Sequence, residues 1–358
     1  MTWIGRRYPI IVDTDRESLH FREMPLIPHF RAWRSVLSVA LGTFFASVPV
    51  SFAQTFTLPA PGLDVALSPS GVAVVPLSGA SLVWVRAADG TVRTPAFYPD
   101  DCSVLVNRKG TRAYFRGYAT PHMFLLELGT DQSFARGYDT APTDLALTPD
   151  EKFILTGLDN KTVLISDTVH FGDFAAIPVS GLPRSIVITP DSKFALVATG
   201  PSGNRIAKID ITKRAITQQI KVNSSISKLA ISPDGKKLYA VVSRRKGGSS
   251  FSRSLEVFKI ESGKREQSVP LALSGSQVPT FDIEADTAGI FVSSTVPFTV
   301  AGKTAGVVRL PIRANRVSQP RLFSTRNLGS LAISLDRKGK KLGVLKSNGL
   351  SVSFLKVP

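Results

Sequence analysis

The chain is poor in the residues that build metal, haem and disulfide sites. It has one cysteine, Cys102, and of its four histidines only His122 and His170 lie beyond residue 53. A single cysteine excludes an intramolecular disulfide, and the lack of a Cys-x-x-Cys-His motif excludes covalently attached haem. Neither histidine has a second ligand at a spacing typical of metal sites. We therefore expect no metal and no cofactor, and we interpret Cys102 as a small buried apolar residue.

Signals for nucleophilic catalysis and for helices are missing as well. The sequence has no Gly-x-Ser-x-Gly motif and no set of serine, histidine and acid that a repeat would bring together. No long stretch places apolar residues at the 3.6-residue period of an amphipathic helix. These absences favour an all-β protein without a catalytic triad.

What recurs along the chain is a unit of strand, tight turn and strand. Its clearest copy is residues 226–238, ISKLAISPDGKKL, in which an apolar strand runs into a turn at Pro233, Asp234 and Gly235. Proline presets φ, aspartate hydrogen-bonds the nearby backbone, and glycine tolerates a positive φ, so each residue suits a turn for its own reason. One such unit predicts a hairpin, so the number of copies decides the fold.

Seven copies can be aligned on the turn. The residues at the proline position, 39 to 54 residues apart, are Pro69, Arg108, Pro149, Pro190, Pro233, Thr287 and Leu335. Repeats of about 40 residues made of strands and turns are typical of β-propeller blades with four strands each. The sequence therefore predicts an all-β, seven-bladed propeller. Because the last copy has only three strands, we expect residues 54–59 to add the fourth and close the ring, which removes an exposed sheet edge.

The run ISPDGKKLYA, residues 231–240, resembles the YVTN-type β-propeller repeat family of bacterial and archaeal surface-layer and periplasmic proteins. The likeness is strongest in the third to fifth copies, and the copies at Arg108, Thr287 and Leu335 depart from the Ser-Pro pattern. Propellers of this type include redox-enzyme domains, lactonases and binding modules. The resemblance thus implies a fold, and function has to be argued from sites.

Residues 1–53 have the features of a secretory signal peptide with a long leader. Arg31 and Arg34 precede an apolar stretch at residues 36–50, and small residues suited to cleavage follow at residues 51–53. The apolar stretch is too short for a comfortable transmembrane helix, and Met24 is an alternative start. We expect residues 54–358 to form the propeller in the periplasm or outside the cell, with no transmembrane segment after signal removal.

The residues that open the first strand of each copy are expected at the mouth of the central channel. They are Asp64, Ser103, Asp144, Ser185, Lys228, Asp282 and Ser330, and Arg184 precedes Ser185. Asp64, Asp144, Arg184, Lys228 and Asp282 form a candidate site for a cation or a polar small molecule. The alternative is that polar side chains at this mouth satisfy backbone groups at the strand ends.

Positive charge is concentrated in the second half of the chain. The formal net charge is +17; residues 54–201 have 11 Lys and Arg against 14 Asp and Glu, whereas residues 202–358 have 27 against nine. Such an asymmetry makes one side of a ring positive, and that side attracts polyanions. The candidate basic surface, at turns and in a loop at residues 243–254, comprises Lys213, Arg214, Lys236, Lys237, Arg244, Arg245, Lys246, Lys264, Arg265, Arg337, Lys338, Lys340 and Lys341.

Two functions from different classes remain open. The first is an exported, non-catalytic binding or scaffold module that engages an acidic protein, an acidic glycan or an anionic membrane surface. We expect no nucleic-acid partner, because the chain is exported and lacks stacking aromatics between its basic residues. The second is a lactonase-like enzyme or a redox-accessory propeller that acts at the channel mouth. The scarcity of histidine and cysteine favours the first function.

Overall fold

The computed structural model describes most of the chain beyond residue 53. The described ranges are 54–78, 81–86, 92–93, 102–117, 120–200, 204–247, 250–273, 279–326, 329–336, 340–349 and 351–357. The predicted signal peptide, residues 1–53, lies outside these ranges, as do Arg337, Lys338 and the side chain of Cys102. Within the described ranges no helix is long and apolar enough to cross a membrane.

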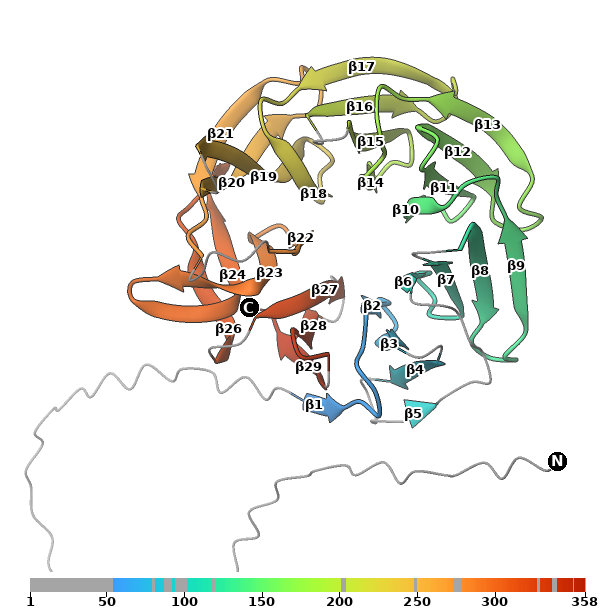
Figure 1. Cartoon of the computed structure of the whole chain (residues 1–358), viewed down its shortest axis with the longest axis horizontal. Coiled ribbons are helices and arrows are strands. Elements are labelled where there is room, and N and C mark those ends of the chain that lie inside the picture. Colours follow the sequence, from blue (N-terminus) through green and yellow to red (C-terminus); the bar gives the residue numbers. More distant parts are fainter. Residues whose placement is uncertain are drawn as a thin grey trace, which may run out of the picture. The chain divides into compact units, whose positions relative to one another are not determined.

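Seven antiparallel sheets surround a central axis, which confirms the predicted propeller (Figure 1). We number the sheets as blades 1 to 7 and letter the strands of each blade a to d from the axis outwards. Blade 1 comprises β2 (Ala66–Leu67), β3 (Val72–Leu77), β4 (Ser81–Arg86) and β5 (Val92–Arg93), and blade 2 comprises β6 (Cys102–Val106), β7 (Arg112–Gly117), β8 (His122–Glu127) and β9 (Ser133–Gly137). Blade 3 comprises β10 (Pro142–Leu147), β11 (Phe153–Leu158), β12 (Thr162–Asp167) and β13 (Asp173–Pro178). Blade 4 comprises β14 (Ser185–Ile188), β15 (Phe194–Thr199), β16 (Arg205–Asp210) and β17 (Ala215–Lys221).

Blades 5 to 7 follow the same plan with local additions. Blade 5 comprises β18 (Ser225–Ile231), β19 (Lys237–Gly247), β20 (Ser250–Lys259) and β21 (Arg265–Pro270). Blade 6 comprises β22 (Phe281–Ala285), β23 (Gly289–Val300), β24 (Lys303–Arg313), β25 (Arg316–Val317) and β26 (Arg321–Arg326). Blade 7 contains β27 (Ser330–Asp336), β28 (Lys341–Lys346) and β29 (Ser351–Lys356). In blade 6 both β25 and β26 pair with β24, at different parts of that strand.

The ring is closed by the strand that the sequence predicted. β1 (Gln54–Thr57) pairs antiparallel with β29, so the outermost strand of blade 7 comes from the beginning of the propeller. Phe56 packs edge-on against Phe354 with ring centroids 5.6 Å apart, and Leu58 is buried in the cluster between blades 7 and 1. The closure therefore combines strand pairing with apolar burial.

The turn between strands a and b explains why the repeat is visible in the sequence. The hydroxyl of Ser232 accepts a hydrogen bond from the Lys237 amide at 2.9 Å, and the carboxylate of Asp234 accepts one from the Lys236 amide at 3.0 Å. Gly235 closes the turn with φ of 71°, a backbone region that disfavours side chains. In blade 3 Glu151 occupies the equivalent position with φ of 60°. In each of blades 1 to 5 the turn thus has a polar cap and, three residues later, a residue with a positive φ.

Apolar side chains fill the spaces between blades. Among the described residues seven buried clusters occur, and each joins two adjacent blades around the ring. The cluster between blades 4 and 5, for example, contains Leu196 and Ile206 from one blade and Leu238 and Phe258 from the next. Burial of such residues is the main favourable contribution to folding, so each blade depends on both of its neighbours.

The two ends of the propeller differ. At the end that we call the turn face lie the a–b and c–d turns; at the opposite end, the hairpin face, strand a begins and the b–c connections lie. In blade 5 β19 and β20 have 11 and 10 residues, and in blade 6 β23 and β24 have 12 and 11, whereas strand b of blades 3 and 4 has six. The prediction of a loop at residues 243–254 is therefore wrong for its described part, because residues 243–247 and 250–254 belong to paired strands of an extended hairpin. Five extra residues lengthen a strand by about 16 Å.

Candidate functional site

The central channel contains a cavity of about 670 Å³. Its wall is formed by strand a of every blade, and therefore by residues far apart in the sequence. Asp64, Asp144, Lys228 and Asp282 border it toward the hairpin face, and Pro69, Pro149 and Pro233 border it toward the turn face. This volume is sufficient for a small molecule.

We call the position that opens strand a the ring position, and the structure corrects its seventh member. A bulge precedes Asp144, Lys228 and Ala332 at the same place in blades 3, 5 and 7, so Ala332 is the counterpart of Lys228. Ser330, expected from the sequence, lies two residues earlier, is fully buried and does not line the cavity. The physical reason is that Asp336, rather than Ser334, takes the capping position of the blade 7 turn, opposite Lys341.

At four places around the ring a ring side chain ties its blade to the next. The Asp64 carboxylate accepts a hydrogen bond from the Val104 amide at 3.0 Å, and Asp144 accepts one from Ile186 at 2.6 Å. In the same way, the Ser185 hydroxyl accepts a hydrogen bond from the Leu229 amide of the next blade at 3.1 Å. The Asp282 carboxylate likewise accepts one from the Ile333 amide at 3.0 Å. In every case the donor is the amide that follows the ring position in the neighbouring blade. These side chains therefore satisfy the unpaired inner edge of strand a.

The pattern changes where the preceding ring residue has no acceptor. Lys228 and Ala332 offer none to the next blade. The amides that would lack an acceptor for this reason are those of Ile283 and Val65. The Ile283 amide instead donates to the Asp282 carboxylate at 2.9 Å, and the Val65 amide donates to the Asp64 carboxylate at 2.8 Å. Asp64 and Asp282 thus each bind two backbone amides, one in their own blade and one in the next. Ser334 adds a further link from blade 7, because its hydroxyl accepts from the Leu67 amide at 2.8 Å.

Asp64, Asp144, Lys228 and Asp282 form a charged group at the ring position, in which Lys228 is the cation. Burial acts to lower the pKa of Lys228, but the carboxylates of Asp144, Asp282 and Asp64 outweigh it and raise that pKa, so the ammonium stays charged. Burial raises the pKa of Asp64 to about 6, with a further contribution from Asp282 and an opposing one from Lys228. Burial likewise raises the pKa of Asp282. The group can hold a polar or cationic molecule, and its three carboxylates also join the inner strands of neighbouring blades.

Two arginines near the channel mouth differ from what the sequence predicted. Arg184, predicted as a channel ligand, is exposed and is not among the residues that line the cavity. Arg116 was not predicted; it lies on β7 opposite Ser103, and its charge acts on Lys228. The signal in the sequence was a second arginine in this strand b, RAYFRG, after the apolar residues AYF.

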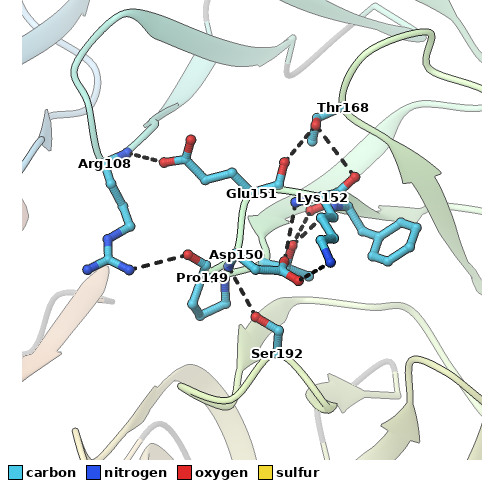
Figure 2. A network of polar contacts seen from close by, with 9 residues as sticks. Arg108, Pro149, Asp150, Glu151, Lys152, Thr168 and Ser192 are labelled. Carbon is cyan, nitrogen blue, oxygen red and sulfur yellow. Dashed lines mark hydrogen bonds and ion pairs between the residues drawn. The ribbon is translucent and has the colours of Figure 1, made fainter.

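On the turn face a polar network links three successive blades (Figure 2). The Glu151 carboxylate accepts from the Arg108 amide at 2.6 Å, and the Arg108 guanidinium donates to the Pro149 carbonyl at 3.4 Å. On the other side the Asp150 amide donates to the Ser192 hydroxyl at 3.1 Å. The turns thus hold one another in place around the channel exit.

The predicted basic residues are divided between the two faces. Arg244, Arg245 and Lys246 are exposed at the tip of the blade 5 hairpin. The turn face carries those in a–b and c–d turns, namely Lys213, Arg214, Lys236, Lys237, Lys264, Arg265, Lys340 and Lys341.

Several of the turn-face cations have acidic partners. Lys213 lies 3.9 Å from Asp210, Lys237 lies 3.5 Å from Glu266, and Arg265 lies 3.0 Å from the buried Glu256. These pairs reduce the net positive potential of the turn face.

The described residues contain no group of three or more His, Cys, Asp and Glu side chains placed to hold a metal ion. His170 is exposed beside Asp167 on the turn face, with Nδ1 3.7 Å from the carboxylate, and His122 stacks on Phe124 with centroids 6.0 Å apart. The two histidines are on different blades, so the structure does not bring them together.

Comparisons with known proteins bear on the fold. No family model and no curated protein matches the sequence. A hydrazine synthase structure from Kuenenia stuttgartiensis is similar with a TM-score of 0.69 and 14% identity, covering 89% of this chain and 99% of that one. The β-propeller domain of Cps50 (Swd1) from Myceliophteria thermophila is similar with a TM-score of 0.63 and 12% identity, covering 85% and 100%. At these identities the likeness extends to the propeller fold and no further.

Proposed function

We propose that this protein is an exported, non-catalytic β-propeller of the YVTN type that binds an acidic partner or an anionic surface. The observation that carries the proposal is the separation of charge: 27 Lys and Arg against nine Asp and Glu in residues 202–358, and 11 against 14 in residues 54–201. Positive potential on one side of a ring raises the local concentration of polyanions and speeds their association. The apolar stretch at residues 36–50 supports export to the periplasm or beyond.

The hydrogen bonds of the channel also support a non-catalytic role. Asp64, Asp144 and Asp282 each accept from backbone amides of strand a. A carboxylate that satisfies buried amides contributes to the fold, and substrate binding would have to compete with those bonds. The charged group therefore has a sufficient structural explanation.

The test is a pull-down with residues 54–358 from an envelope extract of the source cells. We expect a partner that is retained at about 50 mM salt and lost at about 500 mM, because screening weakens exposed charge pairs. A combined variant with Lys213, Lys236, Lys264, Arg244, Arg245 and Lys246 all changed to Gln should lose the partner. A control variant with three exposed lysines of the acidic half, Lys109, Lys152 and Lys161, changed to Gln should keep it. Retention that ignores both salt and the basic variant contradicts the proposal.

A second candidate is an enzyme at the channel mouth, favoured by the charged group around the 670 Å³ cavity. Its test is Asp144→Asn, which removes one carboxylate charge and keeps an oxygen acceptor for the Ile186 amide. A lactonase-type activity that is present in the parent and lost in a folded Asp144→Asn variant would establish catalysis. An unchanged rate would exclude Asp144 from it.

A further inference from the structure

On blades 4 to 7 the hairpin face is basic and nearly free of acids. Exposed cations there include Arg205, Lys221, Arg244, Arg245, Lys246 and Lys303, on strand ends and hairpin tips. Among the described residues of these blades the acids lie at the turn face or within strands, except Asp282 of the ring. The positive potential of this half of the propeller is therefore least compensated on the hairpin face.

The most prominent cations lie on the extended hairpin of blade 5. Arg244, Arg245 and Lys246 follow one another along β19 near its tip. Opposite Arg245 in the strand register is Phe251, whose side chain is 43% exposed. Arg253 is two residues away on the same strand, with its guanidinium 6.0 Å from the centre of the Phe251 ring. An exposed aromatic ring is thus surrounded by positive charge at a protruding point.

The hairpin is held in place at its base. The Leu271 amide donates to the Arg253 carbonyl at 2.9 Å, and the Thr299 amide donates to the Ala272 carbonyl at 3.0 Å. Residues 271–273 therefore connect the blade 5 hairpin to the blade 6 hairpin. Phe298 of the latter is buried and packs against Phe281, with ring centroids 6.4 Å apart. The two hairpins form a supported ridge.

We propose that the tip of the blade 5 hairpin docks on the surface of an anionic phospholipid bilayer. In this arrangement Arg244, Arg245 and Lys246 lie at the phosphates, and the Phe251 ring enters the boundary between headgroups and acyl chains. A protruding tip with an aromatic ring suits a flat surface that has both charge and an apolar layer. A soluble polyanion would use the charges but would give Phe251 no apolar layer to enter. This inference rests on the proposed function and names its target.

The experiment is sedimentation with vesicles, using residues 54–358. This portion contains every sheet pairing and buried cluster described above, so it folds on its own, and it lacks the apolar stretch at residues 36–50 that would itself enter bilayers. Vesicles contain phosphatidylcholine alone or with about 30% phosphatidylglycerol. We expect binding to the anionic vesicles only, and we expect it to weaken as salt rises from about 50 to about 500 mM.

Two variants test the hairpin. Arg244→Gln, Arg245→Gln and Lys246→Gln together should weaken binding by roughly a hundredfold, since each basic residue near an anionic surface strengthens binding several-fold. Phe251→Ser should weaken it by roughly tenfold through lost apolar burial. The matched control changes Lys213, Lys236 and Lys264 on the turn face to Gln, with the same loss of charge, and should bind within about threefold of the parent. Melting temperatures of all variants confirm that they are folded.

An insertion readout uses Phe251→Trp. Its fluorescence, after subtraction of the parent spectrum, should shift to the blue with anionic vesicles and not with neutral ones. Equal losses in the hairpin and turn-face variants would overturn the assignment of this surface. Salt-sensitive binding to soluble poly-glutamate without vesicle binding would overturn the bilayer proposal and leave the proposed function standing. Binding to neither would contradict both.

Discussion

Asp64→Asn separates the two roles of a ring carboxylate, which accepts two backbone amides and also introduces a charge. The folded state raises the pKa of Asp64 from 3.8 to about 6, chiefly through burial. A folded pKa above the unfolded one means that the folded protein binds the proton more tightly. The contribution of Asp64 to stability is therefore greatest below about pH 4 and is lost as the pH rises to about 6.

The magnitude follows from the size of the shift. Two pKa units correspond to about 3 kcal/mol, an upper bound here because Asp64 borders the cavity and keeps some access to solvent. Asparagine resembles the protonated carboxyl group in shape and in its single strong acceptor. We expect parent and Asp64→Asn to unfold with nearly equal free energies at pH 4. At pH 7.5 the variant should be more stable by about 2 kcal/mol.

The assay is urea unfolding of both proteins at several pH values between 4 and 7.5, with the difference in free energy as the measured quantity. Groups far from Asp64 titrate alike in both proteins and cancel in that difference. Asp191→Asn is a control of opposite sign, because hydrogen bonds from Thr189 and the Lys193 amide outweigh partial burial and hold the pKa of Asp191 below its usual range. That variant should lose stability at neutral pH relative to the parent. Parallel pH profiles for the parent and Asp64→Asn would refute the reasoning.

Four other changes test the remaining contacts by thermal or urea unfolding. Deleting residues 54–60 removes β1, Phe56 and Leu58, and should lower the melting temperature by about 10 °C or more; an unchanged value would contradict ring closure. Lys228→Met leaves three carboxylates without their cation and should cost about 3 to 5 kcal/mol at pH 7.5, less at pH 5. Glu151→Ala should cost about 0.5 to 1 kcal/mol by removing the exposed hydrogen bond to the Arg108 amide, whereas the exposed Lys152→Ala should cost almost nothing. Ser334→Ala should cost about 1 to 2 kcal/mol through the Leu67 amide.

The sequence was sufficient for the fold because the repeat is specified by local chemistry. Ser232, Asp234 and Gly235 act within their own turn, so the same residue types mark the same place in other blades. The closing strand was predictable because the last copy lacked one strand and residues 54–57 were left over. Both inferences needed only the count and spacing of copies.

The register of blade 7 could not be read in the same way. Blade 7 has no proline between strands a and b, so the sequence alignment placed Leu335 opposite Pro233. The pairing of Leu335 with Leu342 instead makes Leu335 the counterpart of Ile231, two residues earlier in the unit. A better guide was blade 2, in which Asn107 caps its turn by accepting from the Thr111 and Arg112 amides at 2.9 and 3.0 Å. Asp336 has the equivalent place in the blade 7 pairing. The cap, rather than the proline, carries the register.

The extended hairpins and Arg116 were missed for a different reason. Pairing of Arg245 with Phe251 depends on contacts across the strand and on support from residues 271–273, neither of which leaves a periodic signal in so short a segment. Arg116 matters because β7 places it opposite Ser103, which only the sheet register reveals. The charge pattern of the sequence identified the basic half of the chain. Which face of the propeller carries Arg244, Arg245 and Lys246 depended on the length of β19, which the charge pattern does not show.

The ring side chains and the blade 5 hairpin differ in whether the propeller fold needs them. Strand a has no partner strand on its inner edge, so amides there need other acceptors. Asp64, Asp144, Ser185 and Asp282 supply them, and these side chains would be needed whatever the protein binds. The blade 5 hairpin is not needed for closure, since blades 3 and 4 are complete with strands of six residues. Exposed cations and an aromatic ring on an element that the ring does not need are better explained by binding than by stability.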